Sequence, residues 1–340
     1  MRVVDCHGHF TSEPPQLAEF RRRQLAALDA GDGPAPDLPA ISDQELVDCI
    51  SANQLRVMDE RGIDMVLFSP RASAMGHHVG DQETGRAWTR LSNDLVRRVC
   101  DLFPDRFAPV CQLPQTPGGD LGAPIAELRR CVEAGFVAAN INPDPSGGNW
   151  TGRPVTDPYW FPLFEAMEEL EVPGMIHVSG SCNPNFHALG AHYLNADTTV
   201  FMQLLEGDLF GRFPGLRFVI PHGGGAVPYH WGRYKGLAAR FDRPPIDTHL
   251  MGNVFFDTCV YHRPGVELLL KVVPTPNVLF GSEMLGAVRG VNPETGSGWD
   301  DTRLYVESLG LPEETRAALY EGNVRRVYPR LDRRLREQGR

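Results

Sequence analysis

Two histidines near the N-terminus have the spacing of a metal-ligand pair. His7 and His9 stand two residues apart at the end of an apolar, β-branched run that begins at Val3. Side chains at positions i and i+2 of a strand point to the same face, so both imidazoles would converge on one side of a sheet. Neutral imidazole is the commonest metal ligand in proteins. The pair therefore indicates a catalytic divalent metal, although an HxH pair by itself is also compatible with a structural role.

Three more residues that could bind a metal or transfer a proton stand at the ends of later apolar runs. His177 follows GMI, His222 ends RFVIPH, and Glu283 follows VLFGS. A single histidine in such a place is commonly a hydrogen-bonded structural residue, but core packing does not explain why several strand ends carry one. Three neutral imidazoles and a carboxylate suit Zn²⁺ with solvent in an open position, and Mn²⁺, Fe²⁺ or Co²⁺ accept the same donors. The run AANINPD offers no lysine to bridge two metals, which favours one metal.

Short runs rich in β-branched and aromatic residues predict eight strands. The runs are Val3–His7, Met65–Ser69, Phe107–Leu113, Phe136–Asn142, Gly174–Val178, Leu216–His222, Val254–Thr258 and Val278–Gly281. The segments between them have helical periodicity; they include Asp43–Arg61, Gly85–Leu102, Ile125–Glu133, Trp160–Leu170, Thr198–Asp208 and Gly265–Val272. This alternation predicts an α/β fold, a (β/α)8 TIM-type barrel with its site at the carboxyl ends of the strands. A doubly wound open sheet is the alternative, but the first strand–helix connection carries no glycine-rich phosphate loop.

Two segments depart from the alternation. Thr11–Ala40 includes GDGPAPDLPA, whose proline and glycine content predicts a long irregular excursion over the barrel mouth. Asp300–Arg340 predicts C-terminal helices, the last of them rich in arginine and solvated. Because no internal repeat or linker is evident, we expect residues 1–340 to form a single barrel domain.

Composition and charge exclude several functional classes. The net charge of −10 over 340 residues argues against a nucleic-acid-binding protein, which needs a basic surface. Seven scattered cysteines without a CxxC pair indicate neither a disulfide framework nor a zinc knuckle. The polar N-terminus MRVVDCHGHF does not resemble a signal peptide, and no apolar run is long enough to span a bilayer. We therefore expect a cytoplasmic protein with neither a nucleic acid nor a membrane as partner.

Four short strings carry a resemblance to a known family. They are DCHGH, IHVSG, PHGGG and FGSEM. Together they resemble the amidohydrolase superfamily, and within it the branch related to aminocarboxymuconate semialdehyde decarboxylase; the resemblance runs over the whole chain. It implies that His7, His9, His177 and Glu283 hold the metal. It also implies that His222 stands beside the metal-bound water as a hydrogen-bonding partner or base.

Longer strings narrow the resemblance to one group of that branch. They are ISDQEL, FSPRASAM, INPDPSGG, IHVSGSCNP, IPHGGGAVPYHWGR, FFDTCVYH and FGSEMLGAVRG. These are similar to the 4-oxalomesaconate hydratases of aromatic-acid catabolism, and related enzymes suggest a homodimer. Most relatives carry Asp where this chain has Glu283, whose carboxylate stands one methylene farther from the backbone. Glu283 could bind the metal directly or serve in proton transfer, and the sequence leaves both roles open.

The resemblance implies a metal-dependent hydro-lyase of protocatechuate or gallate catabolism. Such an enzyme adds a metal-activated water to the C=C bond of an oxo-tricarboxylate. A non-oxidative decarboxylase or hydrolase of the same branch, acting on a carboxylated aromatic or muconate-type acid, is the alternative, because nearly the same metal site serves all of them. A third alternative is a non-enzymatic scaffold that binds a metal. In such a protein these strand-end residues would be retained although no reaction is catalysed.

A small polycarboxylate substrate requires cationic and hydrogen-bonding side chains near the metal. Arg71, in SPRASAM, could bind a carboxylate in a bidentate manner, or form a surface salt bridge. Arg289 follows Glu283 closely and could anchor a second carboxylate. Tyr193, in the segment after His177, could donate to a carboxylate or an enolate, or be an ordinary packed tyrosine.

Three further residues are weaker candidates. Asn142, at a strand end, could donate to the substrate, or form a turn before Pro143. Cys182 lies in the segment after His177 and could also contact the substrate. Glu45 is a candidate general acid. Alternatively, it is a structural residue in the first turn of a helix capped by Ser42 or Asp43.

Overall fold

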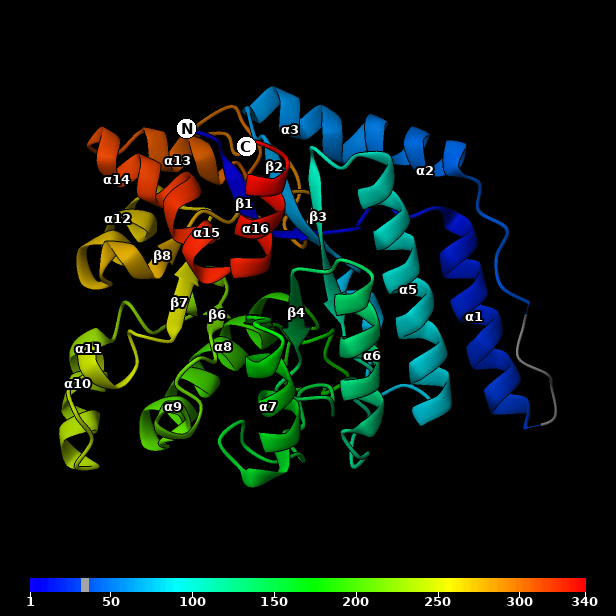
Figure 1. Cartoon of the computed structure of the whole chain (residues 1–340), viewed down its shortest axis with the longest axis horizontal. Coiled ribbons are helices and arrows are strands. Elements are labelled where there is room, and N and C mark those ends of the chain that lie inside the picture. Colours follow the sequence, from blue (N-terminus) through cyan, green and yellow to red (C-terminus); the bar gives the residue numbers. More distant parts are fainter. Residues whose placement is uncertain (32–36) are drawn as a thin grey trace.

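The computed structural model describes residues 1–31 and 37–340, and these contain one sheet of eight parallel strands in the order β1 to β8 (Figure 1). The strands are β1 Val4–His9, β2 Met65–Ser69, β3 Phe107–Gln112, β4 Ala138–Ile141, β5 Gly174–Ile176, β6 Phe218–Ile220, β7 Val254–Asp257 and β8 Val278–Leu279. Cys6 N donates to Phe280 O and Glu283 N donates to His7 O, so the chain after β8 is joined to β1. The predicted TIM-type barrel is confirmed.

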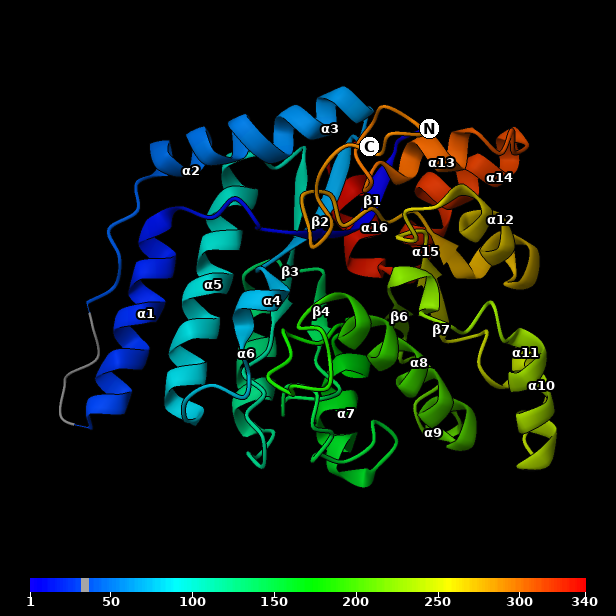
Figure 2. The same ribbon diagram turned by 180° about the vertical axis from the view of Figure 1, so that it is seen from behind.

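Helices connect successive strands and lie around the barrel (Figures 1 and 2). Those before β6 are α1 Pro15–Ala30, α2 Asp43–Ile50, α3 Arg56–Arg61, α4 Ala72–Met75, α5 Gln82–Leu102, α6 Gly122–Glu133, α7 Phe161–Glu169, α8 Gly190–Glu206 and α9 Leu209–Arg212. Those after β6 are α10 Trp231–Arg240, α11 Ile246–His249, α12 Arg263–Val272, α13 Thr302–Glu307, α14 Glu313–Ala317, α15 Asn323–Val327 and α16 Pro329–Glu337. The π-helical turns η1 and η5 are Ser51–Leu55 and Ala318–Gly322, and the 3₁₀ turns η2, η3 and η4 are Pro158–Trp160, His222–Gly224 and Thr275–Asn277.

All six helices named from the sequence are present, and five of them have at least one shifted end. The predicted helix Asp43–Arg61 is a continuous run of α2, the π-helical turn η1 and α3. The largest shift is in α8, which begins at Gly190, so Tyr193 lies in its first turn. Within the described part of the chain, we find no helix that combines the length and apolarity needed to cross a bilayer.

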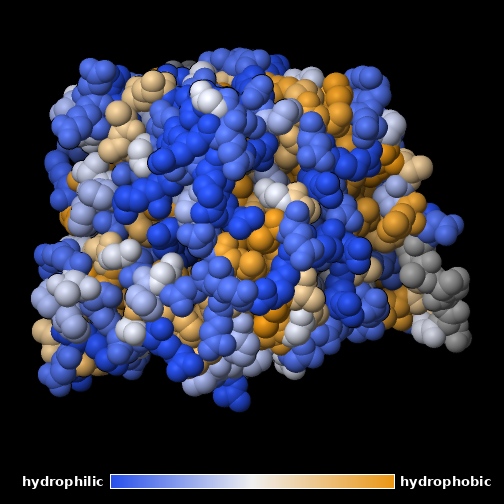
Figure 3. Space-filling view, viewed as in Figure 1, coloured by the Kyte–Doolittle hydropathy of each residue, from blue (hydrophilic) through white to orange (hydrophobic). Residues whose placement is uncertain are grey.

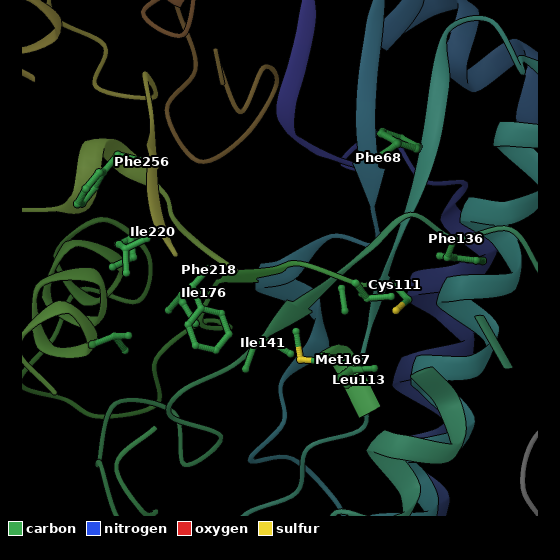
Figure 4. Close-up of a cluster of buried hydrophobic side chains, with 14 of the residues drawn as sticks. Phe68, Cys111, Leu113, Phe136, Ile141, Met167, Ile176, Phe218, Ile220 and Phe256 are labelled. Carbon is green, nitrogen blue, oxygen red and sulfur yellow. The ribbon is translucent and has the colours of Figure 1, made fainter. Parts of the chain in front are cut away.

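The hydrophobic core has an inner and an outer part. Inside the barrel, short apolar side chains such as Val4 and Ala108 pack together. Between the strands and the helices, larger side chains such as Phe218 and Phe256 form an extended buried cluster (Figure 4). The face seen in Figure 3 is mostly hydrophilic with smaller hydrophobic patches between. This core holds the strand ends in fixed positions.

The expected irregular excursion after β1 is largely wrong. Pro15–Ala30 forms the helix α1, which lies beside α5 on the outside of the barrel rather than over its mouth (Figure 1). Leu17, Phe20 and Gln24 are its buried residues, and Phe20 stacks on Trp88 of α5 with ring centroids 6.5 Å apart. Residues 32–36, within GDGPAPDLPA, lie outside the described residues.

The predicted C-terminal helices are present, and the last of them is only half solvated. Leu331 and Leu335 of α16 are fully buried among the side chains inside the barrel, together with Val327 and Tyr328. Arg333 and Arg336 on the other face of α16 are exposed. The helix therefore closes one end of the barrel with its apolar face, while the arginines remain in solvent.

We expect Leu331→Ala to destabilise the protein by about 2–5 kcal/mol, because it removes a fully buried side chain and leaves a cavity at the closed end of the barrel. The shift of the urea unfolding midpoint measures this loss. Glu337→Ala, at an exposed position of the same helix, is the matched control and should change stability by less than about 0.5 kcal/mol. Equal midpoints for both variants would contradict the closing role of α16.

Candidate metal centre

A change of register in β1 aims the two histidines at the barrel mouth. Cys6 belongs to the apolar cluster inside the barrel, and His7 and His9 meet directly beyond it. Adjacent residues of a regular strand point to opposite faces, so Cys6 and His7 could not both face inward. The pairing of β1 with β2 shifts between Asp5 and Gly8, as in a bulge that redirects a side chain. The predicted convergence of His7 and His9 is confirmed.

Asp5 fastens this part of β1 to the loop after β8. Its Oδ1 accepts hydrogen bonds from His7 N at 2.9 Å and from Ser282 N at 3.1 Å, and its Oδ2 accepts one from Ser282 Oγ at 2.5 Å. Burial raises the pKa of Asp5 to about 6, and the hydrogen bonds from Ser282 and His7 oppose this shift. Because Glu283 follows Ser282 directly, the network sets the histidine pair beside the carboxylate.

Three imidazoles converge through their Nε2 atoms. His9 Nε2 lies 3.1 Å from His7 Nε2 and 3.1 Å from His177 Nε2. All three side chains are buried, and the ring planes of neighbouring pairs are nearly perpendicular. Burial, followed by the neighbouring histidines, lowers the pKa of His9 and of His177 well below the ordinary value. These two imidazoles are therefore held neutral.

The opposite nitrogen of each ring is held by an acceptor. The pairs are His7 Nδ1 with Asp257 Oδ2 at 2.7 Å, His9 Nδ1 with Ser69 Oγ at 2.7 Å, and His177 Nδ1 with Val178 O at 2.8 Å. A carboxylate or a carbonyl only accepts, so Nδ1 of His7 and His177 carries the proton and Nε2 carries a lone pair. Ser69 Oγ has one proton and lies 3.2 Å from both Gly8 O and Pro70 O, so it accepts from His9 Nδ1 when it donates to either carbonyl.

This arrangement fits a divalent metal. The Nε2 atoms of His7 and His177 each lie 3.1 Å from His9 Nε2, so a cation placed between these nitrogens could bind all three. Metal-binding histidines in proteins almost always donate their other ring N–H to an acceptor, as His7 and His177 do in this cluster. The tautomers, the burial and the donor set thus agree with the expected metal site.

Glu283 and His222 join the three imidazoles. Ligand atoms of His7, His177, His222 and Glu283 all lie within 4.8 Å of one another, and His9 adjoins them through its contacts with His7 and His177. Both Glu283 (φ 50°) and His222 (φ 51°) have left-handed backbone conformations, in the segments that follow β8 and β6. The structure therefore gathers all five residues that the sequence placed at the barrel mouth.

His222 is oriented by an aspartate from α8. Its Nδ1 lies 2.9 Å from Asp197 Oδ2, and its Nε2 lies 3.9 Å from Glu283 Oε2. Burial lowers the pKa of His222, but the charge and hydrogen bond of Asp197 raise it more strongly, and the result is about 9. Nε2 is buried and has no hydrogen-bond partner among the described residues. It is therefore available to exchange a hydrogen bond or a proton with a group at the centre.

A cavity of about 350 Å³ opens onto the centre. Its polar lining residues are His9, Thr11, Arg71, Ser73, Tyr193, Glu283 and Arg289. Tyr193 is buried and stacks on His222, with ring centroids 5.5 Å apart, and burial followed by the charge of Glu283 raises its pKa. Arg71 Nε donates to Ser73 Oγ at 3.0 Å, and Arg71 Nη1 lies 4.0 Å from Glu13 Oε1. The cavity thus combines two cations and a phenol with the strand-end cluster.

Three sequence candidates do not line this cavity. Asn142 is fully buried, and its Nδ2 lies 2.8 Å from His77 Nδ1. Cys182 is exposed, and its Sγ contacts Gly147 O at 3.4 Å. Glu45 is half-buried and forms the capping box of α2 with Ser42, which is the alternative role that the sequence offered. Their proposed contacts with substrate gain no support from these positions.

Sequence reasoning did not name four residues that shape the site. Asp257, which holds His7, ends β7, so the strand-end rule that found the histidines applied to it as well. Ser69, which holds His9, ends β2 and falls under the same rule. Asp197 lies inside α8, and Tyr261 lies in the loop after β7. No local pattern identifies those two, because each reaches the site only through tertiary packing.

Comparisons with known proteins identify the family and the fold of the chain. The family model described as Amidohydrolase matches residues 4–330. A 2-keto-4-carboxy-3-hexenedioate hydratase from a Sphingobium species is 58% identical over 340 residues, covering 100% of this chain and 99% of that protein. The crystal structure of a 4-oxalomesaconate hydratase from Rhodopseudomonas palustris has a TM-score of 0.92 at 52% identity, covering 99% of this chain and 98% of that one. A Polaromonas dihydroxybenzoic acid decarboxylase with bound manganese shares the fold, with a TM-score of 0.68 at 19% identity over 96% of this chain and 97% of its own.

We expect the double variant His7→Ala, His9→Ala to lose the bound metal, because it removes two of the three converging lone pairs. Metal content after dialysis, measured by elemental analysis, tests this. His230→Ala replaces an exposed histidine outside the cluster and should keep the metal content of the unaltered protein. Full metal content in the double variant would refute the assignment of the centre.

Proposed function

The chain belongs to the amidohydrolase family, and on this basis we propose that it is a metal-dependent hydro-lyase that hydrates an oxo-tricarboxylate. The substrate class is that of its relatives, 2-keto-4-carboxy-3-hexenedioate or 4-oxalomesaconate. The observation that carries the proposal is 58% identity to such a hydratase over the whole chain. The whole of residues 1–340 then acts as a single barrel domain.

We propose His7, His9, His177 and Glu283 as ligands of one divalent metal. Their three neutral imidazoles and one carboxylate favour Zn²⁺, with Mn²⁺ or Fe²⁺ as alternatives that the same donors accept. When bound, such an ion acts as a Lewis acid and lowers the pKa of water to about 7. The protein contributes fixed tautomers of His7 and His177, because Asp257 and the Val178 carbonyl accept their Nδ1 protons.

His222 is the proposed partner of the reacting water. Hydration places a hydroxyl on the carbon β to the ketone and a proton on the carbon between them, so one proton must leave water and one must reach carbon. His222 Nε2 faces Glu283 at 3.9 Å and is otherwise unpaired among the described residues. Asp197 fixes the ring through Nδ1. His222 can therefore accept or donate a hydrogen bond on the same side of the substrate as Glu283.

Arg71, Arg289 and Tyr193 are the proposed substrate-binding residues. The substrate carries three carboxylates and a ketone whose oxygen gains negative charge as water adds. Arg71 and Arg289 line the cavity and suit two of the carboxylates. The Tyr193 hydroxyl has no hydrogen-bond partner among the described residues and lies beside His222, where it can donate to the developing enolate.

The activity is tested with the metal-replete protein and oxalomesaconate. We expect loss of the conjugated absorbance and formation of a tertiary alcohol by NMR, with activity abolished by a strong chelator and restored by Zn²⁺. Carbon dioxide release from a carboxylated aromatic acid, with no hydration, would instead support the decarboxylase alternative. Unchanged absorbance with a folded, metal-replete sample would refute the hydratase assignment.

We expect Arg71→Gln to raise KM about 10- to 100-fold and to leave the metal content unchanged, because a charge-assisted contact of roughly 1.5–3 kcal/mol to a carboxylate is lost. Steady-state kinetics and elemental analysis measure the two effects. Arg263→Gln, at an exposed position outside this cavity, is the control and should keep the KM of the unaltered enzyme. An unchanged KM in Arg71→Gln would remove Arg71 from the substrate site.

A further inference from the structure

Tyr261 reaches the centre from a loop that the proposed mechanism does not use. It stands four residues after the end of β7, with a left-handed backbone conformation at φ 58°. Its hydroxyl donates to Glu283 Oε2 at 2.7 Å. A bulky residue at positive φ raises the conformational free energy of the backbone. Such a conformation persists where contacts with the surrounding structure hold it in place.

The same carboxylate oxygen has two other neighbours. Cys259 Sγ lies 3.8 Å and His222 Nε2 lies 3.9 Å from Glu283 Oε2. The hydrogen bond from Tyr261 is the shortest of the three contacts and has ordinary geometry for a hydroxyl donor. Oε2 is therefore committed to Tyr261, whereas Oε1 has no hydrogen bond among the described residues and remains for the metal or the reacting water.

Gly286 confines Glu283 from another side. A Cβ at Gly286 would lie 2.8 Å from Glu283 Cδ and 2.6 Å from Glu283 O, so the carboxylate passes directly over this glycine. Glutamate has one more rotatable bond than aspartate, and a carboxylate on that longer chain needs outside contacts to keep one orientation. The surface of Gly286 and the hydroxyl of Tyr261 supply them.

We infer that Tyr261 is a positioning residue that orients the Glu283 carboxylate, so that one oxygen is held and the other faces the centre. The inference rests on the proposed function through the place of Glu283 in the metal centre. Tyr261 acts through Glu283 and is not among the residues that line the cavity. Removing its hydroxyl frees the carboxylate to rotate, which weakens metal binding and misplaces the group that faces the reacting water.

Tyr261→Phe tests this with metal binding measured apart from turnover. We expect the Zn²⁺ dissociation constant, from competition with a chromophoric chelator, to rise about 10- to 100-fold, as for other residues that orient metal ligands. At saturating Zn²⁺ we expect kcat to fall while KM for oxalomesaconate stays unchanged, because the arginines of the cavity are intact.

Tyr320→Phe is the matched control. The Tyr320 hydroxyl also donates to a glutamate, Glu307 Oε1 at 3.0 Å, and this pair lies among the C-terminal elements outside the centre. Its Zn²⁺ affinity should equal that of the unaltered protein. Each variant loses only one hydroxyl, so we expect both to fold. The urea unfolding midpoints of the two metal-free variants test this.

A double-variant cycle separates positioning from a general structural effect. In a Glu283→Ala background, Tyr261→Phe should leave Zn²⁺ affinity unchanged, because there is no carboxylate left to orient. Equal Zn²⁺ affinity and kcat in Tyr261→Phe and the unaltered protein would overturn the inference. If the unaltered protein lacks hydratase activity but Tyr261→Phe still weakens Zn²⁺ binding, the proposed function fails and the positioning role stands.

Discussion

The convergence of three imidazole Nε2 atoms is the constraint around which the site is arranged. His9 Nε2 lies 3.1 Å from the Nε2 atoms of His7 and of His177, and all three rings are buried. The pure acceptors at Nδ1 of His7 and His177 fix those two tautomers, so that their Nε2 lone pairs face the centre. The protein therefore holds these lone pairs in place for a metal to bind.

Barrel closure supplies the rigidity that this arrangement requires. His7 belongs to the first strand and Glu283 follows the last, yet Glu283 N donates to His7 O at 2.8 Å. Asp5, buried between the same two segments, accepts from both His7 N and Ser282 N. His7 and Glu283, 276 residues apart in sequence, thus become neighbours through backbone hydrogen bonds. The rigid sheet therefore fixes the positions of their side chains.

The sequence predicted those parts of the site that obey the periodicity of a strand. His7, His9, His177, His222 and Glu283 were found because they end apolar runs, and the structure gathers them. Helix α1 was missed because the turn residues GDGP outweighed the apolar spacing of Leu17 and Phe20, although Pro15 stands where prolines commonly begin helices.

Asp197 and Tyr261 mark the limit of sequence reasoning. Asp197 reaches the centre from a helix and Tyr261 from a loop. No local sequence pattern predicts that they contact His222 and Glu283. Only the packing of α8 and of the loop after β7 against the barrel decides those contacts.

The loops after the last three strands each hold a site residue with a left-handed backbone conformation. His222, Tyr261 and Glu283 all have positive φ, between 50° and 58°, and such conformations cost about 1–3 kcal/mol each. Each is restrained by a contact to another part of the site: His222 to Asp197, and Tyr261 to Glu283. Regular strands can aim ligands only along their own two faces. The loop residues with positive φ place side chains in directions that a strand cannot. The position of the imidazole cluster therefore depends on the sheet, and the positions of His222 and Glu283 depend on tertiary contacts between loops.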